Sequence, residues 1–364
     1  FVGCTAILFG TACMGAVKYV PENMKVELSL KVPGNNAVNY KLHPDKLENS
    51  YFDYEWRSDN KLPITVFHKV EERDSCMRLT VQLTAAQDVY FNYRQLLSTG
   101  YRHDNCQFYM PGFWYRRNLR SPKKAPSFHT SDSWLLREDR LSAPLTGIFS
   151  EKEKRFMTVN RLDDFSMDAL ATHKEGEIIL SGKTSLGFTG FENQQGIAML
   201  SFGFPYREAP KSYIRKLTLA PEVEAFQLMK KGESVLLTWE IMESGADDFS
   251  DFIQHTWEHC YDTYAPKPVE NSYSIADMKQ VLSCFFVNSL VDNQPLVYNS
   301  GIHLKVSDCE RNGQAEVGFI GRVLLNAFNA WEYGWQSNRE ELKVNSTKTV
   351  SYTHLRAHET RHDL

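Results

Sequence analysis

The feature that most constrains the fold is a change in hydrophobic period near Gly245. Before it, apolar and polar residues alternate in short runs, as at Val26, Leu28 and Leu30, which is the pattern of a half-buried strand. Clusters of Gly, Pro, Asn and Asp separate these runs, and no long helical pattern interrupts them. Residues 24–243 are therefore predicted to form a large antiparallel β-sandwich. The strand candidates are 25–32, 64–67, 77–83, 155–159, 177–180, 197–202, 215–219 and 235–241.

Past the sandwich, apolar residues recur every three or four positions, which indicates helices. The first predicted helix covers 249–264, begins after acidic cap candidates and ends at Pro266. A second is predicted over 274–291. A third, over 316–335, is apolar nearly all round and is expected to be buried among other helices. The fold class is therefore β then α in two domains, with residues 247–345 as the first helices of a truncated helical domain.

Residues 1–17 carry no charged side chain and are followed by Lys18. Their length fits the apolar region of an export signal better than a membrane span, which needs about 20 residues. No other stretch is apolar enough to cross a bilayer. We therefore expect an exported bacterial protein, periplasmic or at the cell surface. The start Phe1-Val2-Gly3-Cys4 resembles a lipobox, which leaves a lipid anchor at Cys4 open.

The last residues of the chain resemble a sequence that is foreign to the protein. Residues 350–360 resemble the translation of a sequencing adapter over eleven consecutive positions. Residues 349–364 are therefore interpreted as an artefact and excluded from the functional reasoning. This exclusion removes His354, His358 and His362, whose spacing would otherwise suggest a metal site on one helix face. Together with the absence of an initiating Met, the match suggests an incomplete reading frame of metagenomic origin.

The formal net charge of −4 gives no whole-molecule attraction to nucleic acid or to an anionic membrane. Between Arg94 and Arg140, however, nine basic residues stand against four acidic ones and are interleaved with eight aromatic residues. Arg forks bind carboxylates and aromatic rings stack on sugars, so this stretch predicts binding of an acidic glycan. A solvated loop with its aromatic residues packed into the sandwich is the alternative. The candidate substrate contacts are Trp114, Arg116, Arg117 and Trp134.

Carboxylates gather just before and at the start of the third predicted helix, at Asp308, Glu310 and Glu316. A helix N-terminus stabilises negative charge, so these residues fit either a simple cap or an acid or base at a pocket. Asp308 and Glu316 are the catalytic candidates. Arg322 begins a polar stripe along the same helix and is a further candidate substrate contact.

His255, Glu258 and His259 match an H-x-x-E-H pattern, in which two His residues hold zinc and the Glu acts as base. They lie on the polar side of the first predicted helix and no obvious third ligand follows, so a solvated or packed helix face is the favoured interpretation. The five Cys residues beyond the leader show no C-x-x-C spacing. We therefore expect no bound metal and no cofactor, with a zinc metallopeptidase as the remaining alternative.

A large sandwich, a short connection and helices with carboxylates in their loops resemble the plan of the six-hairpin glycosidase superfamily, a supersandwich followed by an (α/α) toroid. The resemblance covers about residues 25–342. It implies a site at the mouth of the toroid, where two carboxylates flank the glycosidic bond of a poly- or oligosaccharide. A glycoside hydrolase is the predicted activity, although lyases, phosphorylases and epimerases share the plan.

The same resemblance places the second catalytic carboxylate in helices beyond this chain, so the fragment itself is expected to be inactive. A non-catalytic glycan-binding sandwich is the main alternative. The sequence leaves the sugar, the linkage and the oligomeric state open.

Overall fold

The computed structural model describes residues 19–73, 76–121, 124–163, 175–215, 217–268, 270, 272–288, 290–291, 297–298, 302–304, 309–311 and 322–359. The chain divides into two compact units, with the boundary after Ala265. The first unit holds strands β1 to β17 and helix α1 (Phe249–Tyr264), and the second holds three helices and two short two-stranded sheets. Helix α1, which the sequence predicts as part of the helical domain, thus belongs to the sandwich unit.

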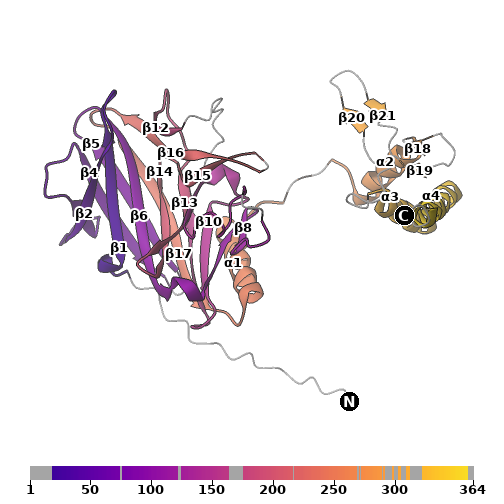
Figure 1. The fold of residues 1–364 in the computed structure, drawn as a ribbon, viewed down its shortest axis with the longest axis horizontal. Coiled ribbons are helices and arrows are strands. Elements are labelled where there is room, and N and C mark those ends of the chain that lie inside the picture. The colour runs from indigo at the N-terminus through magenta and orange to yellow at the C-terminus, as the bar shows by residue number, and fades with distance from the viewer. Residues whose placement is uncertain are drawn as a thin grey trace, which may run out of the picture. The chain divides into compact units, whose positions relative to one another are not determined.

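The strands of the first unit form an antiparallel sandwich of two layers (Figure 1). The strand order of the A layer is β2-β1-β6-β14-β13-β9. The order of the B layer is β3-β4-β5-β17-β11-β10-β7-β8, and β2 links the layers because it pairs with both β1 and β3.

The strands of the A layer are β1 Met24–Lys31, β2 Val38–Lys46, β6 Val89–Arg102, β9 Trp134–Arg137, β13 Phe188–Gln194 and β14 Ile197–Phe204. Those of the B layer are β3 Tyr54–Arg57, β4 Ile64–Glu72, β5 Cys76–Ala85, β7 Cys106–Met110, β8 Trp114–Arg116, β10 Leu145–Ser150, β11 Arg155–Arg161 and β17 Ser234–Gly245. Short 3-10 turns are formed by Pro21–Asn23, His103–Asn105 and Glu138–Arg140.

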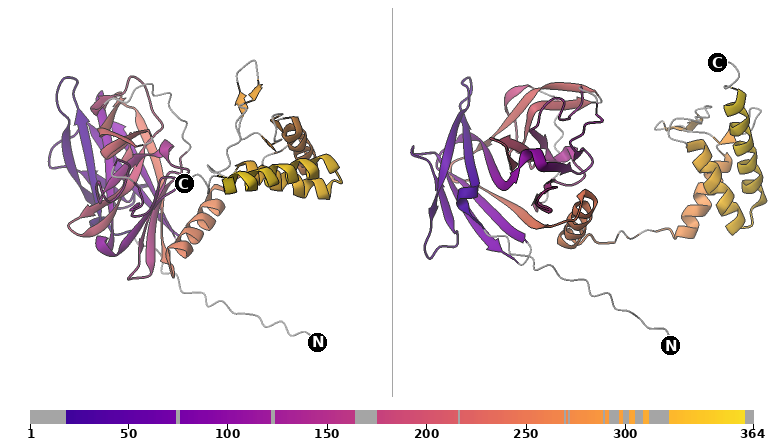
Figure 2. Two further views of the ribbon diagram at one scale, coloured as in Figure 1. Left: turned by 45° about the vertical axis from the view of Figure 1, so that its right-hand side comes forward. Right: turned by 60° about the horizontal axis from the view of Figure 1, so that its bottom comes forward.

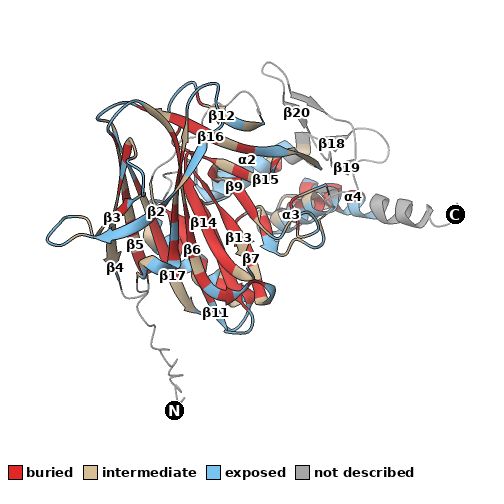
Figure 3. Cartoon of the chain, turned by 60° about the vertical axis from the view of Figure 1, so that its left-hand side comes forward, coloured by how far each residue is buried: buried red, intermediate tan, exposed pale blue. Residues whose placement is uncertain are grey.

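Alternate side chains of the two layers fill the space between them. Phe202 of β14 and Trp239 of β17 have ring centroids 5.2 Å apart, and Phe108 of β7 stacks on Phe191 of β13 at 4.1 Å. Each of these pairs joins one layer to the other, so the apolar positions of the period-two pattern form the core. Strands β6, β13 and β14 are buried along most of their length (Figure 3).

A small ribbon crosses the outer face of the A layer. It consists of β15 (Arg207–Arg215) and β16 (Thr218–Met229), and β12 (Gly176–Ile179) pairs with β16 in parallel. Asn92 of β6 donates hydrogen bonds to the carbonyls of Pro205 and Ala225 at 3.0 and 2.9 Å, so the ribbon lies over this face. The predicted strand 215–219 is wrong, because the chain turns there with Leu217 at a φ of 59°.

Helix α1 packs against the B layer (Figure 2). Asp248 caps it as expected, since its carboxylate accepts hydrogen bonds from the N–H groups of Ser250 and Asp251 at 2.7 and 3.0 Å. Phe252 is fully buried, and its ring centroid lies 4.9 Å from that of Phe156. The helix therefore covers apolar side chains of the sheet rather than standing apart from it.

The second unit contains α2 (Ile275–Asn288), α3 (Arg322–Gln336) and α4 (Glu340–Glu359). It also contains the strands β18 Leu290–Val291, β19 Val297–Tyr298, β20 Ile302–Leu304 and β21 Cys309–Arg311. Ser274, where the predicted second helix begins, caps α2, because its hydroxyl accepts a hydrogen bond from the N–H of Asp277 at 3.1 Å. Helix α4 was not predicted, and it runs into the segment interpreted as an artefact.

The expected burial of the third predicted helix is wrong for the described residues. Leu325, Phe328 and Trp335 of α3 are all more than half exposed. In the described part of the chain, no helix combines the length and the apolar character that a membrane crossing requires.

Candidate functional site

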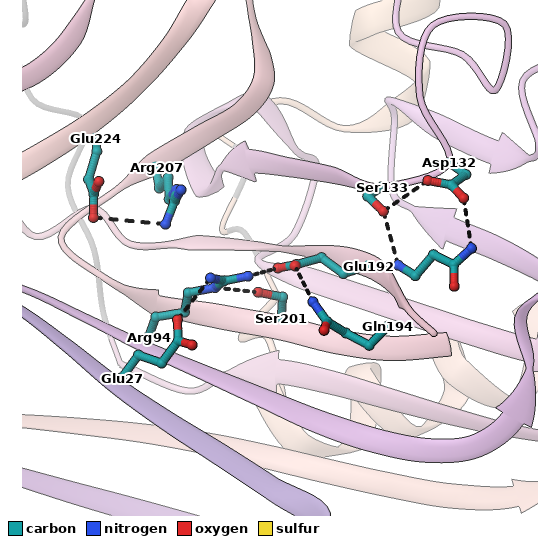
Figure 4. Close-up of polar contacts among 10 residues, drawn as sticks. Glu27, Arg94, Asp132, Ser133, Glu192, Gln194, Ser201, Arg207 and Glu224 are labelled. Carbon is teal, nitrogen blue, oxygen red and sulfur yellow. Dashed lines mark hydrogen bonds and ion pairs between the residues drawn. The ribbon is translucent and has the colours of Figure 1, made fainter. Parts of the chain in front are cut away.

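A cluster of charged and polar side chains lies on the outer face of the A layer (Figure 4). Arg94 donates to the carboxylate of Glu27 at 2.9 Å, to the carboxylate of Glu192, and to the hydroxyl of Ser201 at 3.4 Å. Gln194 donates to the second oxygen of Glu192 at 3.4 Å. We call Glu27, Arg94, Glu192, Gln194 and Ser201 the Arg94 cluster.

Strand register brings these residues together. Glu27 of β1 lies directly opposite Arg94 of β6, and Arg94 lies opposite Gly203 of β14. Directly opposite residues of antiparallel strands share one face, so Glu27, Arg94 and, two residues before Gly203, Ser201 all face outward. Glu192 faces the same way because it lies opposite Met199 of β14. Four strands thus supply the cluster.

Arg94 holds its two carboxylates at a partly buried position. Its side chain is 15% exposed, and those of Glu27 and Glu192 are 16% and 12% exposed. Burial lowers the pKa of Arg94, but the nearby charges of Glu192 and Glu27 outweigh this effect, so the pKa lies above its ordinary value. The guanidinium is therefore a fixed positive charge that orients two glutamates on the sheet face.

Glu224 of β16 is a partly buried acid next to this face, with its side chain 18% exposed. Burial raises its pKa, while Arg207, whose guanidinium lies 3.8 Å from the carboxylate, acts in the opposite direction. Among the described residues, its Oε1 atom has no hydrogen-bond partner. A carboxyl group with a raised pKa keeps its proton to a higher pH than an exposed glutamate does, which is what a proton donor to a ligand oxygen requires.

A second polar group follows Glu192 on the chain. Asn193 donates from its side chain to Asp132 at 2.8 Å, and its backbone N–H donates to the hydroxyl of Ser133 at 2.9 Å. Ser133 in turn donates to Asp132 at 3.1 Å (Figure 4). These bonds fix the end of β13 and thereby the position of Glu192.

A cleft of about 320 Å³ lies at the start of β6. Tyr90 lines it and lies four residues before Arg94, on the same face of the strand, about 13 Å away at the usual rise per residue. Lys183, Lys230 and Glu233 supply its charged side chains. The face thus offers an aromatic ring and charged groups at two positions along β6.

The two tryptophans predicted as substrate contacts are core residues. Trp114 and Trp134 are fully buried, and their rings lie 5.8 Å apart. Their indole N–H groups donate to the backbone carbonyls of Arg116 and Ser131 at 2.8 and 3.0 Å. Neither ring has a face open to a sugar, which corrects the prediction in favour of its alternative. Trp114 also begins strand β8.

The two predicted arginines are used in local contacts. Arg117 donates to the carbonyls of Asp104 and Cys106, and its guanidinium lies 5.4 Å from the ring centroid of Phe128. Arg116 donates to Gln107 at 3.0 Å and lies 4.7 Å from the ring centroid of Phe249. Arg116 ends strand β8 of the B layer and Arg117 follows it, so neither residue is part of the Arg94 cluster.

The remaining predicted site residues fall mostly outside the described residues. Asp308 and Glu316 are among the residues not described, and only the backbone of Arg322, at the start of α3, is described. Their assigned roles stay predictions.

The H-x-x-E-H residues do not converge on one point. His255 lies 3.5 Å from Asp251, and Glu258 accepts a hydrogen bond from Gln254 at 2.8 Å. His259 points instead to Glu240 of β17, at 2.8 Å. This arrangement does not support the zinc metallopeptidase alternative.

Sequence reasoning included Arg94 in a basic stretch but missed Glu27 and Glu192 as its partners. The strand that carries Arg94, β6, was not among the predicted strands, and the structure shows Arg94 between the fully buried residues Tyr93 and Gln95. Such a position faces away from the core, yet the pattern does not reveal which strands lie next to it.

Comparisons with known proteins give structural similarities only. No protein family and no curated protein matches the sequence. A polysaccharide lyase is 13% identical, with a TM-score of 0.31, and the match covers 64% of this chain and 27% of the lyase. A galactose mutarotase related enzyme from Lactobacillus acidophilus is 10% identical, with a TM-score of 0.31 over 60% of this chain and 79% of that one.

A GH36 alpha-galactosidase from Geobacillus stearothermophilus is 10% identical, with a TM-score of 0.29 over 60% of this chain and 30% of that one. The chain thus spans less than a third of the lyase and of the alpha-galactosidase. Similarity at this level assigns no activity to the chain.

Proposed function

We propose that this chain is part of an exported carbohydrate-active enzyme, a glycoside hydrolase of the six-hairpin glycosidase plan, whose sandwich binds a poly- or oligosaccharide on the outer face of the A layer. The observation that carries the proposal is the Arg94 cluster beside Glu224. A sugar presents many hydroxyl groups, and oriented carboxylates, a guanidinium, an amide and a hydroxyl provide the donors and acceptors that such groups need.

The direction of the pKa shift at Glu224 supports hydrolysis in particular. Glycoside hydrolysis needs one carboxyl group that is protonated and one that is ionised. Glu224 has the raised pKa that suits a proton donor, and Glu192 accepts hydrogen bonds from Arg94 and Gln194. Glu316 or Asp308 remains the candidate from the sequence for one of these two roles.

A non-catalytic glycan-binding sandwich is the second candidate. The observation that favours it is that every described member of the Arg94 cluster lies within the first compact unit. Binding by that unit does not need the helices, whereas the sequence-based catalytic carboxylates lie in the second unit.

Binding is tested by affinity electrophoresis of the full chain in gels that contain polygalacturonate, alginate or xylan. We expect retardation in at least one gel. Arg94→Ala and Glu192→Gln should each weaken binding at least about tenfold, because each removes a charge-assisted hydrogen bond that orients the cluster. Arg57→Ala is the matched control, since Arg57 pairs with Asp45 and Glu55 at an exposed position on β3.

If the Arg57 variant lost its retardation in the gel, or if both cluster variants were retarded as strongly as the parent, this site would be contradicted.

Hydrolysis is tested by release of reducing ends, with this chain and with a clone extended past residue 348. Glu224→Gln and Glu316→Gln distinguish the two acid candidates. Binding without release of reducing ends by either protein would favour the non-catalytic candidate.

A further inference from the structure

We propose that Cys76, Glu240 and His259 form a zinc-binding site where helix α1 meets the B layer. This site lies outside the Arg94 cluster and is independent of the proposed carbohydrate function. One ligand atom from each residue, the Cys76 thiol, a Glu240 carboxylate oxygen and a His259 ring nitrogen, lies within 4.8 Å of the other two. No other group of three such ligands is found among the described residues.

Each ligand comes from a different element. Cys76 begins β5, Glu240 lies on the neighbouring strand β17, and His259 projects from α1. The Nε2 atom of His259 is 2.8 Å from Oε1 of Glu240, so two of the ligand atoms already converge. Tetrahedral zinc with these donors needs ligand atoms about 3.3–3.7 Å apart, because Zn–N, Zn–O and Zn–S lengths are about 2.0–2.3 Å. To meet this requirement, the His259 and Glu240 atoms would have to move apart by about 0.5 Å from their hydrogen-bond distance, with the Cys76 thiol completing the set.

The donor set suits zinc rather than magnesium or calcium. Thiolate, imidazole and carboxylate together are the ligands that zinc takes, whereas the two hard cations prefer oxygen alone. Zinc would bring two positive charges to a thiolate and a carboxylate, so the assembled centre would be neutral. The thiol proton would leave to solvent on binding.

Neighbouring residues can orient the ligands, and a metal ion can reach the site from solvent. Arg78 lies 3.6 Å from Oε2 of Glu240, and Thr263 donates to Oε1 at 3.1 Å, so both can orient the carboxylate from outside the metal. Cys76 and Glu240 are buried, but the His259 side chain is 23% exposed, which provides an entry path. Three protein ligands leave the fourth position for water.

The test is a cobalt titration of the metal-free full chain, followed by displacement with zinc. Every protein tested carries His354→Ala, His358→Ala and His362→Ala, so that the tail cannot contribute ligands. We expect one equivalent of Co²⁺ to bind with the near-ultraviolet charge-transfer band of a cobalt thiolate, and zinc to abolish that band. Cys76→Ser should remove the band, and His259→Gln should weaken binding at least about tenfold.

His255→Gln and Cys284→Ser are the matched controls, because His255 lies one turn earlier on α1 and Cys284 is a cysteine of the second unit. Both should bind like the parent. Circular dichroism checks that each variant is folded. Absence of the charge-transfer band in the parent, or an unchanged band in folded Cys76→Ser, would overturn the proposal. Equal cobalt affinity of folded His259→Gln and the parent would do the same.

Discussion

Glu224 lies where the β15–β16 ribbon crosses the A layer, and its position determines how its charge depends on pH. Burial raises its pKa above the ordinary value of a glutamate, so the native state binds this proton more tightly than the unfolded chain does. The resulting stability is fully present below the unfolded pKa and is lost as the pH rises through the folded pKa.

Replacement of this residue by Gln should reverse that loss. Glu224→Gln cannot ionise, so its free energy of unfolding, relative to the parent, should rise as the pH increases from about 4 to 8. The measurement is the urea midpoint of both proteins across that range. Glu71→Gln is the control with the opposite sign, since hydrogen bonding to Lys69 lowers the pKa of Glu71. If the urea midpoints of Glu224→Gln and the parent changed with pH in the same way, the burial argument would be wrong.

Trp114 and Trp134 show why residue type alone misplaced the ligand contacts. An indole suits a sugar face and a protein core equally well, and the choice depends on which strands surround it. Trp114 lies on β8 and Trp134 on β9, in different layers, and both rings turn inward. The sequence identified an aromatic-rich stretch correctly but could not assign the direction of its side chains.

At the scale of single elements, β13 depends on a close approach to β9. Gly190 of β13 lies opposite Leu135, and a Cβ atom at Gly190 would fall 2.0 Å from the carbonyl oxygen of Trp134. The two backbones can keep this spacing only because no side chain intervenes. Since Glu192 follows two residues later, the same approach helps to fix the candidate site.

Gly190→Ala should therefore destabilise the sandwich by at least about 1–3 kcal/mol, the usual cost of overpacking. Gly182→Ala is the matched control, because no atom lies within 4 Å of its added Cβ and its φ is not positive. The control should change the free energy of unfolding by less than about 1 kcal/mol. Thermal unfolding followed by circular dichroism measures both, and similar values for the two variants would refute the close-approach argument.

Two elements could not be located from the hydrophobic pattern of the sequence. The predicted strand 215–219 spans the turn between β15 and β16, and β8 is not among the predicted strands. A short alternating run fits either side of a tight turn, because the pattern records which face is apolar and not where the chain reverses. The starts of α1 and α2 were located from the sequence, because the caps Asp248 and Ser274 act through hydrogen bonds to residues nearby in the chain.

At the scale of the whole molecule, α1 joins the sandwich rather than the other helices. Phe252 packs between Phe149 and Phe156, and the indole of Trp257 donates to Tyr109 of β7 at 2.8 Å. These contacts put an apolar helix face over the B layer. A sandwich without the helix would expose this part of the sheet to water.

Two fragments test this division. Residues 19–265 should unfold cooperatively with the urea midpoint that the sandwich shows in the full chain. Residues 19–247 lack α1 and should lose at least about 3–5 kcal/mol, the usual cost of removing one large buried aromatic side chain. Tryptophan fluorescence of the two fragments measures both transitions. Equal midpoints would show that α1 does not stabilise the sandwich.

The sequence by itself determined the order of the two structural classes, the positions of seven of the strands β1 to β17 and the starts of two helices, because these depend on residues close together in the chain. Tertiary structure alone decided the candidate site. Glu27, Arg94 and Glu192 come from three strands, and their meeting depends on strand order and register. Alternation indicates that a side chain faces outward, but only the folded sheet determines which charges become its neighbours.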